Sequence, residues 1–110
     1  MCGIAGIVTS KREIQPLLDN MMDSLFHRGP DNQNSFIAGD LGLVHTRLSI
    51  IDLSETANQP MKDYTGRYII TYNGEIFNYQ ELRKNLINEG VKFNTNSDTE
   101  VLLNGYVKYG

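Results

Sequence analysis

The chain has 110 residues, 40% of them hydrophobic and 21% charged, which is typical of a globular protein with one domain or part of one. Its formal net charge of −3 argues against a nucleic-acid partner, because such proteins need a basic surface. One cysteine and two scattered histidines form no disulfide and no metal-ligand spacing, so we expect no bound metal. No signal peptide or membrane span is predicted, and a reducing cytoplasm is the expected location.

The chain begins with a predicted strand and a predicted helix. Residues 2–9 are small, apolar and β-branched, a composition that favours a strand. A helix ending near His27 is predicted from apolar residues at helical spacing, namely Ile14, Leu17, Leu18, Met21, Met22 and Leu25. A terminal strand would hold the first residues of the chain in a sheet, whereas chain ends are otherwise usually disordered.

The middle of the chain predicts a loop followed by strands. Residues 28–31 contain Gly and Pro and are predicted as a loop. Residues 35–38 and 41–45 are predicted as two strands joined through a Gly-Asp turn, and residues 67–72, rich in Tyr and Ile, as another. Asn73-Gly74 then ends this strand, in the kind of turn that favours positive φ.

A second helix is predicted over residues 79–89. Asn78 is its expected N-cap, with Glu81 three residues further on, and Gly90 is its expected C′ residue. A brief strand is predicted at residues 91–93.

The last predicted element is a helix that begins with a second capping box, made by Ser97 and Glu100. Antiparallel strands with helices on their faces predict the α+β class. The last helix runs to Gly110 with no obvious strands after it to cover, so we expect a truncated domain.

Cys2 is the first candidate for chemistry. If Met1 is removed, its thiol shares a residue with a free α-amine, whose reference pKa of about 7.7–8.0 suits it to take the thiol proton. The alternative is a small buried apolar side chain, which is commoner for a lone cysteine.

Asn73-Gly74 could supply an oxyanion hole for such a nucleophile. The Asn carboxamide and the Gly backbone N–H are both donors, and a glycine allows close approach of the substrate. The alternative is a simple turn.

Arg47 and Asp98 could hold the two charged ends of a free amino acid. A guanidinium binds a carboxylate in a bidentate pair, and a carboxylate binds an ammonium group. The alternatives are a solvated arginine and an aspartate that only favours the start of a helix. Glu75 and Asp31 are similarly ambiguous loop carboxylates. A Cys-His pair with His27 or His45 is given little weight, because the α-amine already offers a base.

Six blocks of sequence, taken together and in this order, resemble class II glutamine amidotransferases over essentially the whole chain. The version present here is most similar to the glutamine-hydrolysing asparagine synthetase branch. The blocks are Met1-Cys2-Gly3-Ile4-Ala5-Gly6, His27-Arg28-Gly29-Pro30-Asp31, Arg47-Leu48-Ser49-Ile50-Ile51-Asp52, Gln59-Pro60, Asn73-Gly74-Glu75-Ile76-Phe77-Asn78 and Ser97-Asp98-Thr99-Glu100.

The resemblance implies a role for each matching residue. Cys2 would be the nucleophile and its α-amine the base, with the Asn73 side chain and the Gly74 backbone holding the oxyanion. The residues expected to bind glutamine are Arg47, Ile50, Ile51, Asn73, Gly74, Glu75 and Asp98. No firm role is implied for Arg28 or Asp31.

The resemblance also implies a four-layer αββα sandwich, of which residues 1–110 would be the N-terminal part. The rest of that domain would be missing. So would a synthetase domain that binds ATP and Mg²⁺ and accepts the ammonia, and this segment itself would need no cofactor.

L-Glutamine is the expected partner, and a homodimer is compatible with the sequence. Two alternatives stay open: an amidotransferase with another acceptor, such as a surface-polysaccharide sugar, and a non-catalytic fragment or interaction module.

Overall fold

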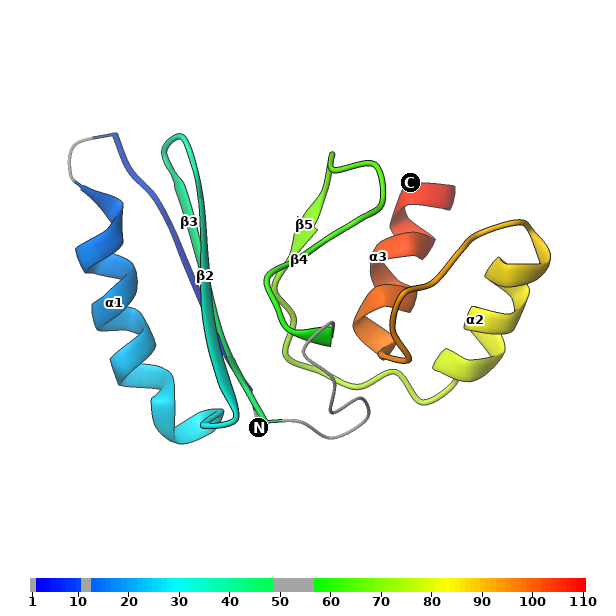
Figure 1. Ribbon diagram of the computed structural model, residues 1–110, viewed down its shortest axis with the longest axis horizontal. Coiled ribbons are helices and arrows are strands. Elements are labelled where there is room, and N and C mark those ends of the chain that lie inside the picture. Colours follow the sequence, from blue (N-terminus) through cyan, green and yellow to red (C-terminus); the bar gives the residue numbers. More distant parts are fainter. Residues whose placement is uncertain (1, 11–12, 49–56) are drawn as a thin grey trace.

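The computed structural model describes residues 2–10, 13–48 and 57–110 (Figure 1). Its elements are β1 (Gly3–Val8), α1 (Ile14–Leu25), the 3-10 helix η1 (Phe26–Arg28), β2 (Asn32–Ala38), β3 (Leu41–Arg47), β4 (Met61–Lys62), β5 (Ile69–Ile70), α2 (Tyr79–Asn88) and α3 (Asp98–Tyr109). The predicted α+β class with antiparallel sheets is confirmed.

The first half of the chain is an antiparallel sheet covered by one helix. The strand order is β1-β3-β2, so that β3 lies in the centre. A Cβ atom at Gly42 would lie 2.7 Å from Ile14 and 2.8 Å from Leu18, which shows how closely α1 approaches β3. Leu18 and Val44 are completely buried in the core of this layer.

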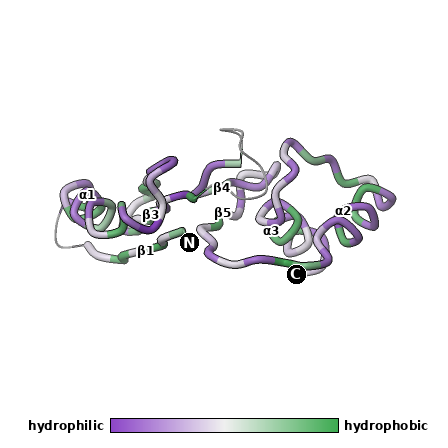
Figure 2. Tube along the Cα trace, turned by 90° about the horizontal axis from the view of Figure 1, so that it is seen from below, coloured by the Kyte–Doolittle hydropathy of each residue, from purple (hydrophilic) through white to green (hydrophobic). Residues whose placement is uncertain are grey.

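Alternation along β3 places its last residues on the two faces of the sheet. Since Gly42 faces α1, Val44 and Thr46 do the same, and His45 and Arg47 project from the opposite face. Figure 1 shows the β4-β5 ribbon on that opposite side, with α3 and then α2 beyond it. The order helix, sheet, ribbon, helices is also seen from below in Figure 2.

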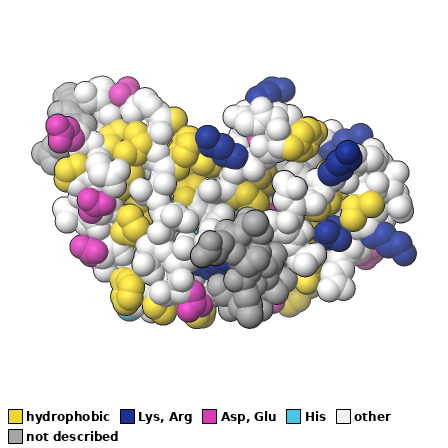
Figure 3. Space-filling model, in the orientation of Figure 1, with side chains coloured by type: hydrophobic (Ala, Val, Ile, Leu, Met, Phe, Trp, Pro, Cys, Tyr) yellow, Lys and Arg dark blue, Asp and Glu magenta, His cyan; other side chains and the backbone are white. Residues whose placement is uncertain are grey.

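Charged side chains of the described residues are unevenly distributed on the face drawn in Figure 3. Figure 3 shows Lys and Arg side chains gathered over the part that carries β4, β5, α2 and α3, with a hollow at the edge between this part and the α1 part. No helix among the described residues is long and apolar enough to cross a membrane.

The strand predicted at residues 67–72 is reduced to a two-residue ladder. Only Ile69 and Ile70 pair, with the short strand β4, which the sequence did not predict. Side chains take the neighbouring backbone donors instead: the Tyr68 N–H donates to the Asp63 carboxylate and the Tyr72 N–H to the Gln59 side chain. The N–H groups of Tyr68 and Tyr72 therefore have hydrogen-bond acceptors although they take no part in a β-ladder.

The strand predicted at residues 91–93 is wrong. Gly90, with φ of 92°, ends α2 as the expected C′ residue, its N–H donating to Ile87 and the Val91 N–H to Leu86. These two bonds are those of a Schellman motif, so the chain after α2 completes the helix end and does not enter a sheet.

The two predicted helix starts behave differently. Ser97 Oγ accepts from the Glu100 N–H, which confirms the cap of α3, but the Glu100 carboxylate reaches back to the N–H groups of Asn94 and Thr95. The side-chain cap predicted for Asn78 is wrong, since its side chain makes no cap hydrogen bond.

Candidate active site

A pocket of about 270 Å³ lies where the end of β3, the segment after β5 and the start of α3 meet. Its lining includes every sequence-predicted site residue that the structure describes: Cys2, Arg47, Asn73, Gly74, Glu75 and Asp98. Ile50 and Ile51 lie outside the described residues. Residues up to 96 positions apart in sequence are thus brought to one cavity by the packing of the two halves.

Cys2 stands immediately before β1, and both ends of the residue are held. Its Sγ accepts a hydrogen bond from the Leu48 N–H at 3.3 Å, and its carbonyl accepts one from Arg28 Nε at 3.1 Å. Arg28, in η1, therefore holds the backbone of the candidate nucleophile, a contact that the sequence did not suggest. The thiol is free and half-buried.

Arg47 is the last residue of β3 and is 7% exposed. Its guanidinium donates to Asn58 Oδ1 at 2.5 Å, which orients the side chain at the pocket wall. Asp31 is not part of the pocket lining. Its backbone N–H donates to the Arg47 carbonyl and so helps to hold the strand end.

Asn73 and Gly74 follow β5 as an irregular segment along the pocket. The positive φ predicted there is wrong, because neither residue adopts it. Gly74 is needed for space: a Cβ atom at this position would lie 2.4 Å from the Tyr72 hydroxyl oxygen. The glycine thus lets the main chain pass directly beside the Tyr72 ring.

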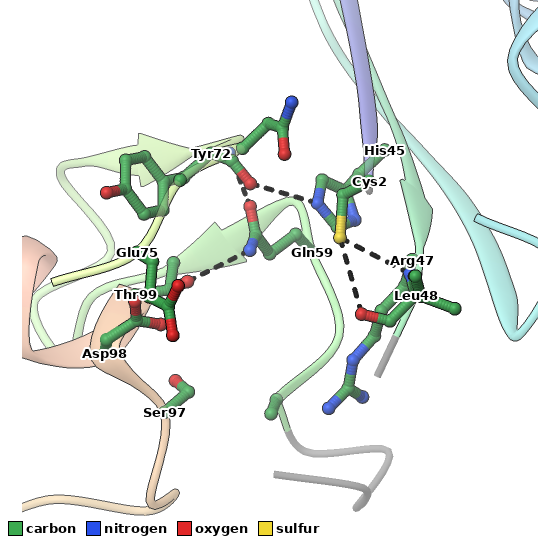
Figure 4. A pocket seen from close by; sticks show the side chains of 13 residues that line it. Cys2, His45, Arg47, Leu48, Gln59, Tyr72, Glu75, Ser97, Asp98 and Thr99 are labelled. Carbon is green, nitrogen blue, oxygen red and sulfur yellow. Dashed lines mark hydrogen bonds between the residues drawn. The ribbon is translucent and has the colours of Figure 1, made fainter. Parts of the chain in front are cut away.

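Asp98 and Glu75 make the acidic side of the pocket, across from Cys2 and Arg47 (Figure 4). Asp98 is the first residue of α3, is 6% exposed and accepts from the Ile76 N–H at 3.1 Å. The pKa of Tyr72 is raised by burial and then by the charges of Asp98 and Glu75, so both carboxylates lie close to its phenol. The pocket therefore has a cationic end and an anionic end.

His45 also lines the pocket, although a Cys-His pair was given little weight in the sequence analysis. It is 1% exposed, and its Nε2 lies 3.2 Å from the Tyr72 carbonyl oxygen. Since a carbonyl can only accept, Nε2 carries the proton, and Nδ1 has no partner among the described residues. Burial lowers the His45 pKa, and the nearby Arg47 charge lowers it further, against the opposing effect of the Tyr72 hydrogen bond. The other histidine, His27, is exposed and outside the pocket.

This buried imidazole predicts a loss of stability in weak acid. Below pH 6.5 the unfolded chain takes up a proton at His45 before the folded chain does. The free energy of unfolding should therefore fall as pH falls, by at most about 1.4 kcal/mol per pH unit from this group. Urea unfolding between pH 7.5 and 5 measures it. His45→Gln should flatten this part of the slope and the exposed-site control His27→Gln should keep it; equal slopes in both variants would contradict the assignment.

Comparison with known proteins shows the family to which the chain belongs. The sequence model of one protein family, the glutamine amidotransferase domain, matches residues 1–110. The chain therefore belongs to that family. It is 41% identical over 114 residues to asparagine synthetase [glutamine-hydrolyzing] 3 of Bacillus subtilis, covering 99% of this chain and 18% of that protein.

Two further relatives widen this comparison. The chain is 40% identical over 129 residues to a putative asparagine synthetase [glutamine-hydrolyzing] 2 of Methanocaldococcus jannaschii, covering all of the chain and 24% of that protein. It is 35% identical over 124 residues to amidase chry2 of Gibberella zeae, of which it covers 18%. The chain spans less than a quarter of the length of these relatives.

Sequence reasoning missed several residues of the pocket wall. Leu48, Ala57, Gln59, Tyr72, Ser97 and Thr99 complete the lining together with His45. Gln59 could have been identified as a candidate, because Gln59-Pro60 is one of the blocks that carry the resemblance. Nothing in the sequence indicated what its side chain binds.

Proposed function

We propose that this chain is the glutaminase segment of a glutamine-dependent amidotransferase of the asparagine-synthetase type. The observation that supports it is the arrangement of one pocket, in which the Cys2 thiol and the Arg47 guanidinium lie on one side and the Glu75 and Asp98 carboxylates on the other. A neutral amide with an amino-acid head group needs this combination of charges.

Recognition of L-glutamine follows from the two charged ends. The Arg47 guanidinium binds the α-carboxylate, and the carboxylates of Asp98 and Glu75 bind the α-ammonium group. Fixing both ends leaves one direction for the side chain, and its amide carbon is then presented to Cys2 Sγ. A substrate lacking either charge loses one of these anchors.

The chemistry is an acyl transfer through the thiol. The α-amine of Cys2 takes the thiol proton, Sγ attacks the amide carbon, and the Asn73 side chain and the Gly74 N–H stabilise the oxyanion. Breaking the C–N bond, with a proton returned to nitrogen, releases ammonia and leaves a γ-glutamyl thioester. Water then cleaves the thioester, which regenerates the thiol and yields glutamate.

The rest of the proposal rests on the resemblance and on the relatives. We assign residues 1–110 to the N-terminal part of a four-layer αββα sandwich, in a protein whose synthetase domain binds ATP and Mg²⁺. Ammonia passes to an aspartate that this domain activates. This segment needs no cofactor of its own, and a reducing cytoplasm keeps its thiol free.

Ammonia release and N-terminal mass together test the mechanism. We expect the protein that carries this chain to form equal amounts of glutamate and ammonia from L-glutamine, and mass spectrometry to show that Met1 is absent. A matched preparation blocked at its α-amine should lose the activity. Full glutaminase activity with Met1 retained would refute the amine as base.

A further inference from the structure

Gln59 is a buried carboxamide in the wall of the pocket, and the proposed chemistry gives it no role. Its exposed fraction is 6%, the same as that of Asp98. It lies two residues before β4, on neither of the two walls that carry the substrate-binding groups. A buried polar side chain in such a place must have its hydrogen bonds satisfied within the protein.

Both ends of this carboxamide are bonded, and to different walls of the pocket. Its Oε1 accepts from the Tyr72 N–H at 2.5 Å, and its Nε2 donates to Thr99 Oγ1 at 3.1 Å. Figure 4 shows the side chain lying between these two partners. Tyr72 immediately precedes Asn73, and Thr99 immediately follows Asp98, so one side chain joins the two segments on which the proposed oxyanion donors and ammonium ligand stand.

The chemistry of the two contacts leaves no freedom in how Gln59 is oriented. The Tyr72 N–H can only donate, so the carboxamide oxygen must face it and the nitrogen must face Thr99. The carbonyl of Tyr72 is meanwhile held by His45 Nε2. Both backbone polar groups of the residue before Asn73 are therefore bound to side chains, in a segment that lacks the support of a β-ladder.

We infer that Gln59 is a positioning residue, which sets the separation between the oxyanion donors at Asn73-Gly74 and the carboxylate of Asp98. The inference rests on the proposed function. It predicts separable effects at its two ends: the Tyr72 bond acts on the transition state through Asn73, and the Thr99 bond acts on substrate binding through Asp98. Displacements of about 1 Å at such distances can cost about 100-fold in rate.

The test uses one variant that removes both bonds and one that removes a single bond, in the protein that carries the chain. Thr99→Val should raise the KM for L-glutamine about ten-fold with kcat changed less than about two-fold. Gln59→Leu should raise KM similarly and also lower kcat by about 10- to 100-fold. Thr99→Ser keeps the hydroxyl and should restore both constants to nearly the wild-type values.

Two matched controls separate positioning from general loss of packing. Gln33→Leu removes a carboxamide that donates to the Gly29 carbonyl, and Thr65→Val removes a hydroxyl that donates to the Asp63 carboxylate; none of these residues lines the pocket. We expect neither to change KM or kcat by more than about two-fold. All constants are expressed per thiol that reacts to completion with an electrophilic glutamine analogue, so that unfolded protein is not counted.

The outcomes are distinct. If Gln59→Leu does not fold, the KM effect of Thr99→Val and its rescue by Thr99→Ser still decide the matter. Wild-type constants per titrated thiol in Gln59→Leu, or in Thr99→Val, would overturn the inference, and so would equal losses in the two controls. A wild-type protein that releases no ammonia from L-glutamine would instead remove the proposed function itself.

Discussion

Replacing Cys2 by alanine should abolish the use of glutamine, with ammonia release lowered by at least about 1,000-fold. The substitution removes the sulfur and keeps the α-amine, so it separates the nucleophile from its base. Because Cys2 is only half-buried and its Sγ forms hydrogen bonds only with the Leu48 N–H and carbonyl among the described residues, folding should be affected little. The measurement is glutamate formation from L-glutamine, together with a thermal melt that verifies the fold.

Ammonia supplied directly gives the matched control for Cys2→Ala. If the protein that carries this chain has the proposed synthetase domain, ammonia-dependent synthesis should continue at nearly the wild-type rate. Cys2→Ser, which keeps a weaker nucleophile in the same place, should be nearly as inactive towards glutamine. Normal glutaminase activity in Cys2→Ala would rule out the thioester route.

Replacing Arg47 should act on substrate binding. Arg47→Ala removes the proposed partner of the glutamine α-carboxylate, and the loss of a buried charged hydrogen bond of about 2–3 kcal/mol corresponds to a rise in KM of about 30- to 150-fold. Arg47→Lys keeps the charge without the bidentate fork and should give an intermediate KM. Steady-state kinetics with L-glutamine measures both.

A substrate analogue makes the Arg47 test specific. For an otherwise identical amide that lacks the α-carboxylate, wild type and Arg47→Ala should have similar KM values, because the lost contact has no counterpart in that substrate. Arg67→Ala serves as the control variant, since Arg67 is exposed and outside the pocket. If Arg47→Ala binds L-glutamine as the wild type does, the carboxylate is held elsewhere.

The fold was predictable from sequence wherever local periodicity and the core agree. The apolar positions of α1 recur at helical spacing, and two of them, Ile14 and Leu18, pack on β3, so the local and tertiary preferences coincide. The Ser97 cap and the Gly90 C′ position were predictable for a similar reason, because each depends on contacts within a few residues.

Two of the expectations that failed depend on side chains that the local sequence pattern does not specify. Residues 67–72 have strand composition, but Asp63 and Gln59 take the N–H groups of Tyr68 and Tyr72. Gly74 was expected to adopt positive φ, yet its requirement is the space that the Tyr72 ring occupies. Composition does not predict these contacts, because it does not specify which side chain lies beside a given backbone group.

The candidate site shows the same division. The sequence by itself determined which residue types are available: one thiol near the start of the chain, an arginine after an apolar strand, an Asn-Gly pair and an aspartate at a helix start. Only the tertiary structure brought them to one pocket and added His45 and Gln59 to its wall. The physical reason is that chemical identity is local, whereas the hydrogen bonds that join Tyr72 to Gln59, and Gln59 to Thr99, exist only after the sheet, the ribbon and α3 have packed together.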